Sequence, residues 1–307
     1  MRLLVVGAGS TGGYFGGRLA QTGADVTFLV RPARAVQLRE KGLRLKSPHG
    51  DAVLHPKIVT AGDINGPYEA VLLAVKGFQL ESAIEELGRA IGKETMIIPV
   101  LNGMQHMDVL AKRFSSGNLI GCALKVATTL EDDGSIVQLS PLQDLAYGEL
   151  DGTMTPRIAA FDKFMHQASI GARLSRVIRR EMWEKWILLA SLGAITCLMR
   201  GPIGEIEACA GGQEFILALL DEIVGIVKIT GEAPSESFLE KTREQLTTKG
   251  SPLASSMFRD LQRGRPIEVE NIIGDLVRRG AEVGFATPLL SAAYVSLCIY
   301  QRRVSEA

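Results

Sequence analysis

The chain lacks a net charge, paired cysteines and clustered histidines. Its 34 basic and 34 acidic residues cancel, so the chain as a whole is not drawn to nucleic acid or to an anionic membrane surface. The 4 cysteines are scattered and form neither a CxxC pair nor a disulfide framework. No histidine has a metal-ligand neighbour at short spacing. We therefore expect a cytoplasmic protein with no metal site and no nucleic-acid or membrane partner.

A targeting or membrane segment is also absent from the pattern. The opening MRLLVVGAG lacks the basic region and cleavable apolar stretch of a secretory signal and runs directly into glycines. The longest apolar run, residues 186–199, is bounded by Lys185 and Arg200. It is shorter than the roughly 18 to 20 residues that span a bilayer, so we expect a buried helix.

The apolar content is sufficient for a sizeable core, since 46% of the 307 residues are hydrophobic. In the first half, short aliphatic and β-branched runs alternate with helical periodicity, which predicts a doubly wound parallel sheet. The expected strands are residues 3–6, 25–30, 70–75 and 96–101, with helices at 12–22 and 79–91.

Two more β segments are expected before the pattern changes. Residues 43–54 alternate around a Ser-Pro-His-Gly turn, typical of an inserted hairpin, and residues 121–149 favour a closing antiparallel pair. The predicted fold class is α/β: an N-terminal Rossmann-type doubly wound sheet, residues 1–174, with a C-terminal all-helical domain, residues 175–307. The predicted helices of the second domain are residues 181–198, 213–230, 235–248, 252–263, 268–283 and 288–302.

A glycine-rich turn joins the first expected strand to the first expected helix, the context in which a GxGxxG pattern binds a dinucleotide. In that role Gly7 makes the tight turn, Gly9 lets the backbone approach the pyrophosphate, and Gly12 lets the helix pack on the strand. The helix N-terminus then faces the phosphates. The alternative is a purely structural turn. The predicted phosphate-binding run is Gly7, Ala8, Gly9, Ser10, Thr11 and Gly12.

The end of the second strand indicates which dinucleotide is bound. An acidic residue there holds the ribose 2′-hydroxyl of NAD, whereas an arginine accepts the 2′-phosphate of NADP. The sequence FLVRPAR has no acid, and Arg31 stands where the acid would be. NADP is therefore the predicted cofactor, with an ordinary surface arginine as the alternative.

Four blocks of the sequence together carry a resemblance to one known family. They are GAGSTGGYFGGRLAQTGADVTFLVR at the start, LLAVKGFQ around Lys76, PVLNGM around Asn102 and SSMFRDLQRGRPIEVENIIG near the C-terminus. With these blocks the chain resembles the ketopantoate reductase (2-dehydropantoate 2-reductase) family from end to end. The resemblance implies hydride transfer from NADPH to the keto carbon of a small-molecule 2-oxo acid, which yields a 2-hydroxy acid, as in pantothenate biosynthesis.

The resemblance assigns the proton donor of this reaction to Lys185, which ends the block REMWEK. A lysine at the start of an apolar helix is a candidate for partial desolvation, which lowers its pKa. A lowered pKa helps a general acid to work near neutrality. A lysine whose ammonium extends to solvent is the alternative.

The same resemblance supplies the remaining site residues. It implies that Asn102 contacts nicotinamide ribose and substrate and that Lys76, with Gln79 in the same loop, lies near both. Ser256 would bind substrate, and Glu268 would contact cofactor ribose and the catalytic lysine. The alternatives are an Asn-Gly turn, a surface lysine, a solvent-facing serine and a glutamate that starts a helix.

Three positions depart from the family pattern. Where the family has asparagines that hold substrate, this chain has Leu189, Gly193 and Ile203. Steps of four and eight residues keep Leu189 and Gly193 on the same side of a helix as Lys185, so we expect an apolar and locally roomier pocket and a changed substrate. Thr196, about 16 Å further along the axis, is too distant to substitute.

Two other functions remain open from the sequence. One is a β-hydroxy acid dehydrogenase of similar plan, and the other is a non-catalytic NADP-binding sensor. Joint retention of Lys185, Asn102 and Glu268 argues against the sensor, which needs no proton donor. A homodimer is possible through the apolar face of residues 215–229, although a helical core explains that face equally well.

Overall fold

The structure, a computed structural model, describes residues 1–306 and consists of two compact units. The first unit comprises Met1–Leu101 and His106–Arg179. The second comprises Asn102–Gln105 and the chain from Arg180 onward. The first unit is α/β and the second is helical, so the predicted fold class is confirmed.

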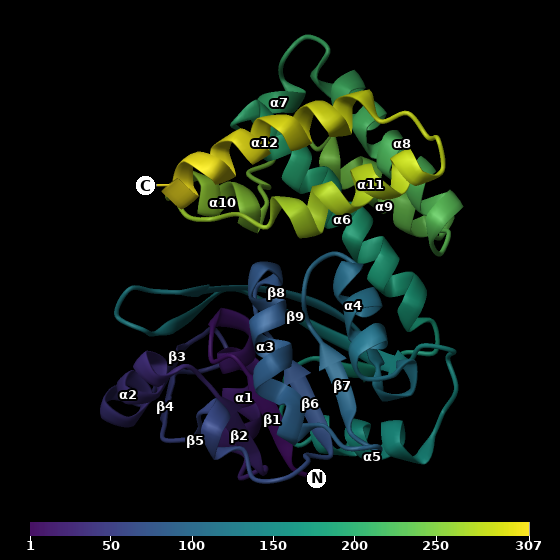
Figure 1. Cartoon of the computed structure of the whole chain (residues 1–307). Helices are drawn as coiled ribbons and strands as arrows, with labels where there is room; N and C mark the ends of the chain where they lie inside the picture. The colour runs from purple at the N-terminus through teal and green to yellow at the C-terminus, as the bar shows by residue number, and fades with distance from the viewer. Residues whose placement is uncertain (307) are drawn as a thin grey trace. The chain divides into compact units, whose positions relative to one another are not determined.

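A five-stranded parallel sheet forms the centre of the first unit (Figure 1). Its four longest strands are fully buried, as expected for strands covered on both faces. The chain reverses its direction of winding between β1 and β6, so the carboxyl ends of these strands form the edge where ligands bind in such folds. The order is β5 (Lys57–Val59), β2 (Val26–Leu29), β1 (Leu3–Val6), β6 (Ala70–Leu73) and β7 (Met96–Pro99).

A second sheet takes up the predicted hairpin and the predicted antiparallel pair. The hairpin is not inserted into the parallel sheet, because Leu45 and Lys46 pair in parallel with the start of the long strand β9. A bulge between Val126 and Thr128 interrupts the antiparallel pair. The strands are β3 (Leu43–Lys46), β4 (Ala52–Leu54), β8 (Ile120–Leu130), β9 (Ile136–Glu149) and β10 (Ala172–Leu174).

Helix α1 (Ser10–Gln21) packs between the two sheets. A Cβ atom on Gly16 would lie 2.8 Å from the ring of Phe28 in β2, and one on Gly13 would overlap Ile136 of β9. The helix therefore needs glycine on both faces. This close approach holds its N-terminus at the carboxyl end of β1.

The remaining helices of the first unit are amphipathic. Helix α3 (Leu80–Leu87) buries Leu80, Ala83, Ile84 and Leu87, the spacing that a one-sided helix requires. The helix predicted over residues 79–91 continues only as a 3₁₀ turn, Gly88–Ala90, because glycine at residue 88 weakens the α-helix. The others are α2 (Pro32–Lys41), α4 (Gln105–Arg113) and α5 (Pro156–Met165).

In the second unit, α8 (Gly212–Thr230) contacts α7, α11 and α12. Its apolar face is buried at seven aliphatic positions, so the core of the unit accounts for this face. The helix predicted over residues 252–263 begins only at Ser256. Ser255 caps its start, since the Ser255 hydroxyl accepts from the Phe258 N–H at 2.9 Å. The others are α6 (Ile178–Met199), α7 (Ile203–Glu207), α9 (Glu236–Leu246), α10 (Ser256–Gln262), a π-helical turn (Glu270–Gly274), α11 (Asp275–Glu282) and α12 (Pro288–Glu306).

Helix α6 contains the apolar run expected to be a buried helix. Its 22 residues make it long and apolar enough to cross a membrane by length and composition. However, 72% of its most apolar window is buried inside the protein. This burial is that of a core helix, and the helix exceeds the apolar run because it begins at Ile178.

Candidate functional site

The three glycines of the turn after β1 differ in whether the fold requires a glycine at that position. Gly7 has φ +92°, and a Cβ there would lie 2.9 Å from the Ala74 carbonyl oxygen. A Cβ on Gly12 would overlap the Gly7 carbonyl and lie 2.8 Å from the Ala74 Cβ. By contrast, Gly9 has an ordinary extended backbone, and no atom beyond its chain neighbours lies within 4 Å of the position of a Cβ. The fold therefore demands glycine at residues 7 and 12 but not at residue 9.

The start of α1 offers hydrogen-bond donors beside Gly9. No side chain caps this helix, and its first turn holds no acidic residue. Ser10 and Thr11 are half-buried there, and the first N–H groups of a helix have no acceptor within it. Together with the helix dipole, such groups favour an anionic phosphate.

The arginines after β2 lie in different environments. Arg31 is exposed and directly precedes α2. Arg34 is half-buried, and its Nη2 and Nε donate to the Ala8 carbonyl at 3.0 and 3.2 Å. Burial lowers the pKa of Arg34, and the charge of Arg44 lowers it further. The sequence pointed to Arg31, whereas Arg34 is the arginine that contacts the glycine turn.

Lys76 lies in the loop after β6, the strand that pairs with β1. Its side chain is exposed, and it precedes a 3₁₀ turn, Gly77–Gln79. The Gln79 Oε1 accepts from the Lys76 backbone N–H at 3.3 Å. Gln79 therefore shapes the loop that carries Lys76.

The segment after β7 clusters with the helical unit. There the Asn102 Nδ2 donates to the Glu268 Oε2 at 3.3 Å, and the Asn271 Nδ2 donates to the Gln105 Oε1 at 3.4 Å. Gly103 has φ +81°, and a Cβ on it would overlap the Asn271 carbonyl. The structure thus brings together Asn102 and buried Glu268, two predicted site residues that are 166 positions apart. The sequence did not indicate Gln105 and Asn271.

Lys185 is half-buried on α6, between two anchored neighbours. The Trp186 indole N–H donates to the Ile272 carbonyl at 2.9 Å. The Glu184 carboxylate accepts from the backbone N–H and the hydroxyl of Ser235, each at 2.8 Å. These bonds fix the backbone on which Lys185 stands.

The expectation of a roomier wall beside Lys185 is wrong at Gly193. A Cβ on Gly193 would lie 2.8 Å from the Cε of Met257, so a buried methionine side chain already occupies the space next to this glycine. Leu189 is half-buried, and Ile203 is fully buried. Met257 therefore occupies the space beside Gly193, while the apolar wall of the substrate pocket stays a prediction.

The neighbouring polar residues divide into a buried group and one exposed serine. Thr196 donates to the Leu192 carbonyl at 2.6 Å and lies 3.0 Å from the Ser255 hydroxyl. Burial raises the pKa of Cys197 beside them to about 12, which makes this thiol unreactive. Ser256, the residue predicted to bind substrate, is exposed at the first position of α10.

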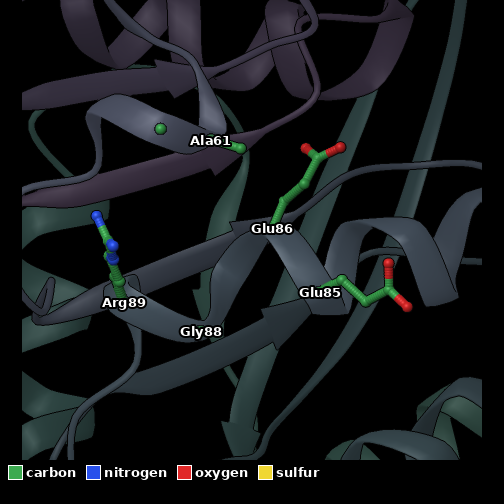
Figure 2. Close-up of a pocket in the computed structure, with 6 residues that line it drawn as sticks. Ala61, Glu85, Glu86, Gly88 and Arg89 are labelled. Carbon is green, nitrogen blue, oxygen red and sulfur yellow. The ribbon is translucent and has the colours of Figure 1, made fainter.

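A separate hollow of about 320 Å³ lies in the first unit. In Figure 2 the charged ends of Glu85, Glu86 and Arg89 point in different directions, so they do not form a binding cluster. None of the predicted site residues lines this hollow. In residues 1–306, no group of three or more His, Cys, Asp and Glu side chains could hold a metal ion.

Comparison with known proteins matches segments from both units to the same protein family. Residues 3–152 match the family described as ketopantoate reductase PanE/ApbA, and residues 177–301 match its C-terminal domain. The chain is 33% identical to the uncharacterized oxidoreductase YkpB of Bacillus subtilis, over 98% of this chain and 99% of that protein. It is 27% identical to the 2-dehydropantoate 2-reductase of Halobacterium salinarum, over 94% of this chain and 95% of that protein.

Solved structures share the fold along the whole chain. A ketopantoate reductase from Ralstonia eutropha aligns with a TM-score of 0.89 at 22% identity, covering 99% of this chain and 100% of that one. A D-mandelate dehydrogenase, solved with NADH and anilino(oxo)acetate, aligns with a TM-score of 0.87 at 19% identity, covering 99% of each chain. The protein described here therefore belongs to the ketopantoate reductase family, whose members are oxidoreductases that act on CH–OH groups.

Proposed function

We propose that this protein is a cytoplasmic enzyme that uses NADPH to reduce a 2-oxo acid to a 2-hydroxy acid, with Lys185 as general acid. Bound NADPH supplies the hydride. The four cysteines are all free thiols in the structure, in keeping with a reducing compartment.

The observation that carries the proposal is the open space beside Gly9. Nothing in the folded chain forbids a side chain there, since a Cβ would meet no atom within 4 Å. A bound pyrophosphate would need that space, because its oxygens approach the backbone at this glycine. The run from Gly7 to Gly12 therefore fits a dinucleotide, with N–H groups at the start of α1 as donors to the phosphates.

Arg31 supports NADPH as the preferred form. It is exposed after β2, where an acidic residue would hold the 2′-hydroxyl of NADH. A D-mandelate dehydrogenase of the same fold has been solved with NADH, so the fold itself does not decide this preference. In our proposal the exposed guanidinium of Arg31 does so by binding the 2′-phosphate.

Lys185 has the chemistry required of the proton donor. Its ammonium would give a proton to the oxygen that becomes negative as hydride reaches the keto carbon. In the proposal Glu268 and Asn102, which are hydrogen bonded to each other, orient the ribose and the substrate, while Lys76 lies near both ligands. The exposed hydroxyl of Ser256 is assigned to the substrate.

The substrate is proposed to be a 2-oxo acid with an apolar side chain. A pocket that hydrogen-bonds a substrate hydroxyl discriminates strongly in its favour. Here Leu189 and Gly193 cannot make such bonds, and Met257 closes the gap beside Gly193. Ketopantoate, which carries a hydroxyl, should therefore not be preferred.

Steady-state kinetics with NADPH across a panel of 2-oxo acids, for the wild type and Lys185→Ala, tests this proposal. We expect the wild type to turn over apolar 2-oxo acids best. Lys185→Ala should keep its affinity for NADPH and lose kcat by at least about a hundredfold, the usual contribution of a general acid.

Each part of the proposal can fail by itself. Unchanged turnover in Lys185→Ala would remove the assigned acid, and a wide preference for ketopantoate would refute the apolar substrate. Turnover of β-hydroxy acids with NADP⁺ but of no 2-oxo acid with NADPH would favour the dehydrogenase instead. Binding of NADPH without turnover of any acid would indicate a sensor.

A further inference from the structure

Arg34 joins three segments of the first unit. Its Nη2 and Nε donate to the Ala8 carbonyl of the glycine turn at 3.0 and 3.2 Å, and Nη1 and Nη2 each lie 3.3 Å from the Gly134 carbonyl. Nη1 also donates to Gln37 one turn along α2. One planar guanidinium thus connects the glycine turn, the start of α2 and the turn between β8 and β9.

The Ala8 carbonyl depends on this arginine. Ala8 is 4% exposed, and no backbone N–H in residues 1–306 donates to its oxygen. In a planar trans peptide the C=O and N–H groups point in opposite directions. By holding the Ala8 oxygen, Arg34 therefore sets the direction of the Gly9 N–H, which belongs to the same peptide unit.

The turn between β8 and β9 is fitted closely to Arg34. Gly134 has φ +84°, and a Cβ on it would lie 2.8 Å from the Arg34 Nη1 and would overlap Gln37. Arg44 anchors the same turn by an ion pair with Asp133 at 3.3 Å. The guanidinium of Arg34 therefore rests on a fixed support.

The charge of Arg34 is not compensated by an acid. Within the described chain no carboxylate lies at ion-pair distance from it, and its partners are two carbonyls and an amide. Burial and the charge of Arg44 lower its pKa, but an arginine keeps its proton at physiological pH. A positive charge therefore remains beside the turn that would meet the phosphates.

We propose that Arg34 is a positioning residue for the dinucleotide: it fixes the Ala8–Gly9 peptide so that the Gly9 N–H is presented to the pyrophosphate. This inference rests on the proposed function, because it presupposes that the glycine turn binds a dinucleotide. Its role differs from that of Arg31. The pyrophosphate is common to NADPH and NADH, so Arg34 serves both cofactors, whereas Arg31 distinguishes between them.

Dissociation constants for NADPH and NADH, measured by fluorescence titration well below the melting temperature, test this role. Arg34→Gln loses the fork of donors and the charge, and we expect it to weaken both cofactors by the same factor, about tenfold. Arg34→Lys keeps the charge, but one ammonium cannot replace the fork, so it should also weaken both. Arg31→Gln is the matched control and should weaken NADPH alone.

Kinetics separates positioning from general damage to the fold. Arg34→Gln should raise the KM for NADPH and leave kcat unchanged at saturation, since the folded molecules keep Lys185. If Arg34→Gln does not fold, the same measurements on Arg34→Lys decide the matter.

Three outcomes would overturn the inference. Arg34 variants that bind both cofactors normally would show that the turn needs no support, and a loss confined to NADPH would make Arg34 a ligand of the 2′-phosphate. Normal binding by Arg34→Lys would show that charge alone suffices. A wild-type protein that binds neither cofactor would instead refute the proposed function.

Discussion

At the scale of single residues, the glycine turn separates the requirements of the fold from those of a ligand. A Cβ on Gly12 would overlap the Gly7 carbonyl, while a Cβ on Gly9 would meet nothing within 4 Å. Both residues belong to the same GxGxxG pattern, and the pattern alone does not distinguish them. The packing shows that the fold requires glycine at residue 12 and leaves residue 9 free to meet a ligand.

We expect Gly9→Ala to fold as stably as the wild type and to bind NADPH at least about tenfold more weakly, because the added methyl group competes with the pyrophosphate. Gly12→Ala is the matched control. It should lower the melting temperature, because the overlap with the Gly7 carbonyl forces the helix away from the strand. Thermal melts and NADPH titrations of both variants measure these effects. Normal NADPH affinity in Gly9→Ala would contradict a dinucleotide site at this turn.

The sequence predicts the residues of a local pattern better than residues that contact distant partners. The glycine turn and Arg31 stand within one short segment, so their roles follow from spacing. Arg34 contacts carbonyls 26 and 100 positions away, and Met257 fills the space beside Gly193 from another helix. These contacts exist only once the chain has folded, which is why the expected roomier wall was wrong.

At the scale of elements, the predicted strands and long helices agree with the structure, and the deviations have local causes. The Ser255 cap delays α10, and the predicted helix over residues 268–283 contains the π-helical turn Glu270–Gly274. The carbonyl of Ile272 in that turn accepts from the Trp186 indole. Hydrophobic periodicity registers neither a cap nor a change of helical hydrogen bonding.

The backbone is strained at the residue that follows helix α6, and a substitution can relieve this strain. Arg200, directly after Met199, has φ +59° and is the one residue other than glycine in the described chain with positive φ. A side chain in this conformation costs about 1 kcal/mol. Glycine relieves this strain but makes the unfolded chain more flexible, which offsets part of the gain. Arg200→Gly should therefore raise the free energy of unfolding by about 0.5 kcal/mol. Denaturant unfolding measures this change.

The matched control is Arg200→Ala, which removes the guanidinium but keeps a Cβ atom. It should give no gain in the free energy of unfolding, because the strain arises at the backbone and the Cβ. A gain as large as that of Arg200→Gly would mean that the charge of Arg200, and not its backbone, destabilises the end of α6.

At the scale of the whole molecule, the positive and negative charges balance, and the pH dependence of stability is therefore expected to come from individual carboxylates whose pKa is lowered in the folded chain. The net charge is zero, so repulsion within the folded chain is small near neutral pH. Burial opposes ionisation of Glu149, but hydrogen bonds from Arg157 and Thr155 outweigh it and lower the pKa of this carboxyl. Hydrogen bonds also lower the pKa of Asp63, Asp133 and Asp151.

The direction of the pH dependence follows from these lowered pKa values. A carboxyl with a lower pKa in the folded chain binds its proton more weakly there than in the unfolded chain. Its contribution to stability is therefore complete above the ordinary pKa, 4.5 for Glu149, and is lost as pH falls through the folded value. The melting temperature should be nearly constant from neutral pH to about pH 5 and should then fall.

Glu149→Gln measures how much one carboxylate contributes to the loss of stability at acidic pH. Glu149 is 7% exposed and pairs with Arg157 at 2.6 Å, joining the end of β9 to α5. The substitution should cost about 2 kcal/mol near neutral pH, because Arg157 loses its charged partner. The deficit should shrink as pH falls below 4.5, because the carboxyl takes up its proton first in the unfolded chain and only at lower pH in the folded wild type. Asp144→Asn, which removes the more exposed pair with Arg173, is the control and should cost less than about 1 kcal/mol.

Melting temperatures of the wild type, Glu149→Gln and Asp144→Asn between pH 3 and 8 measure the effect. A deficit of Glu149→Gln that stays constant over that range would show that Glu149 acts by packing and not by its charge.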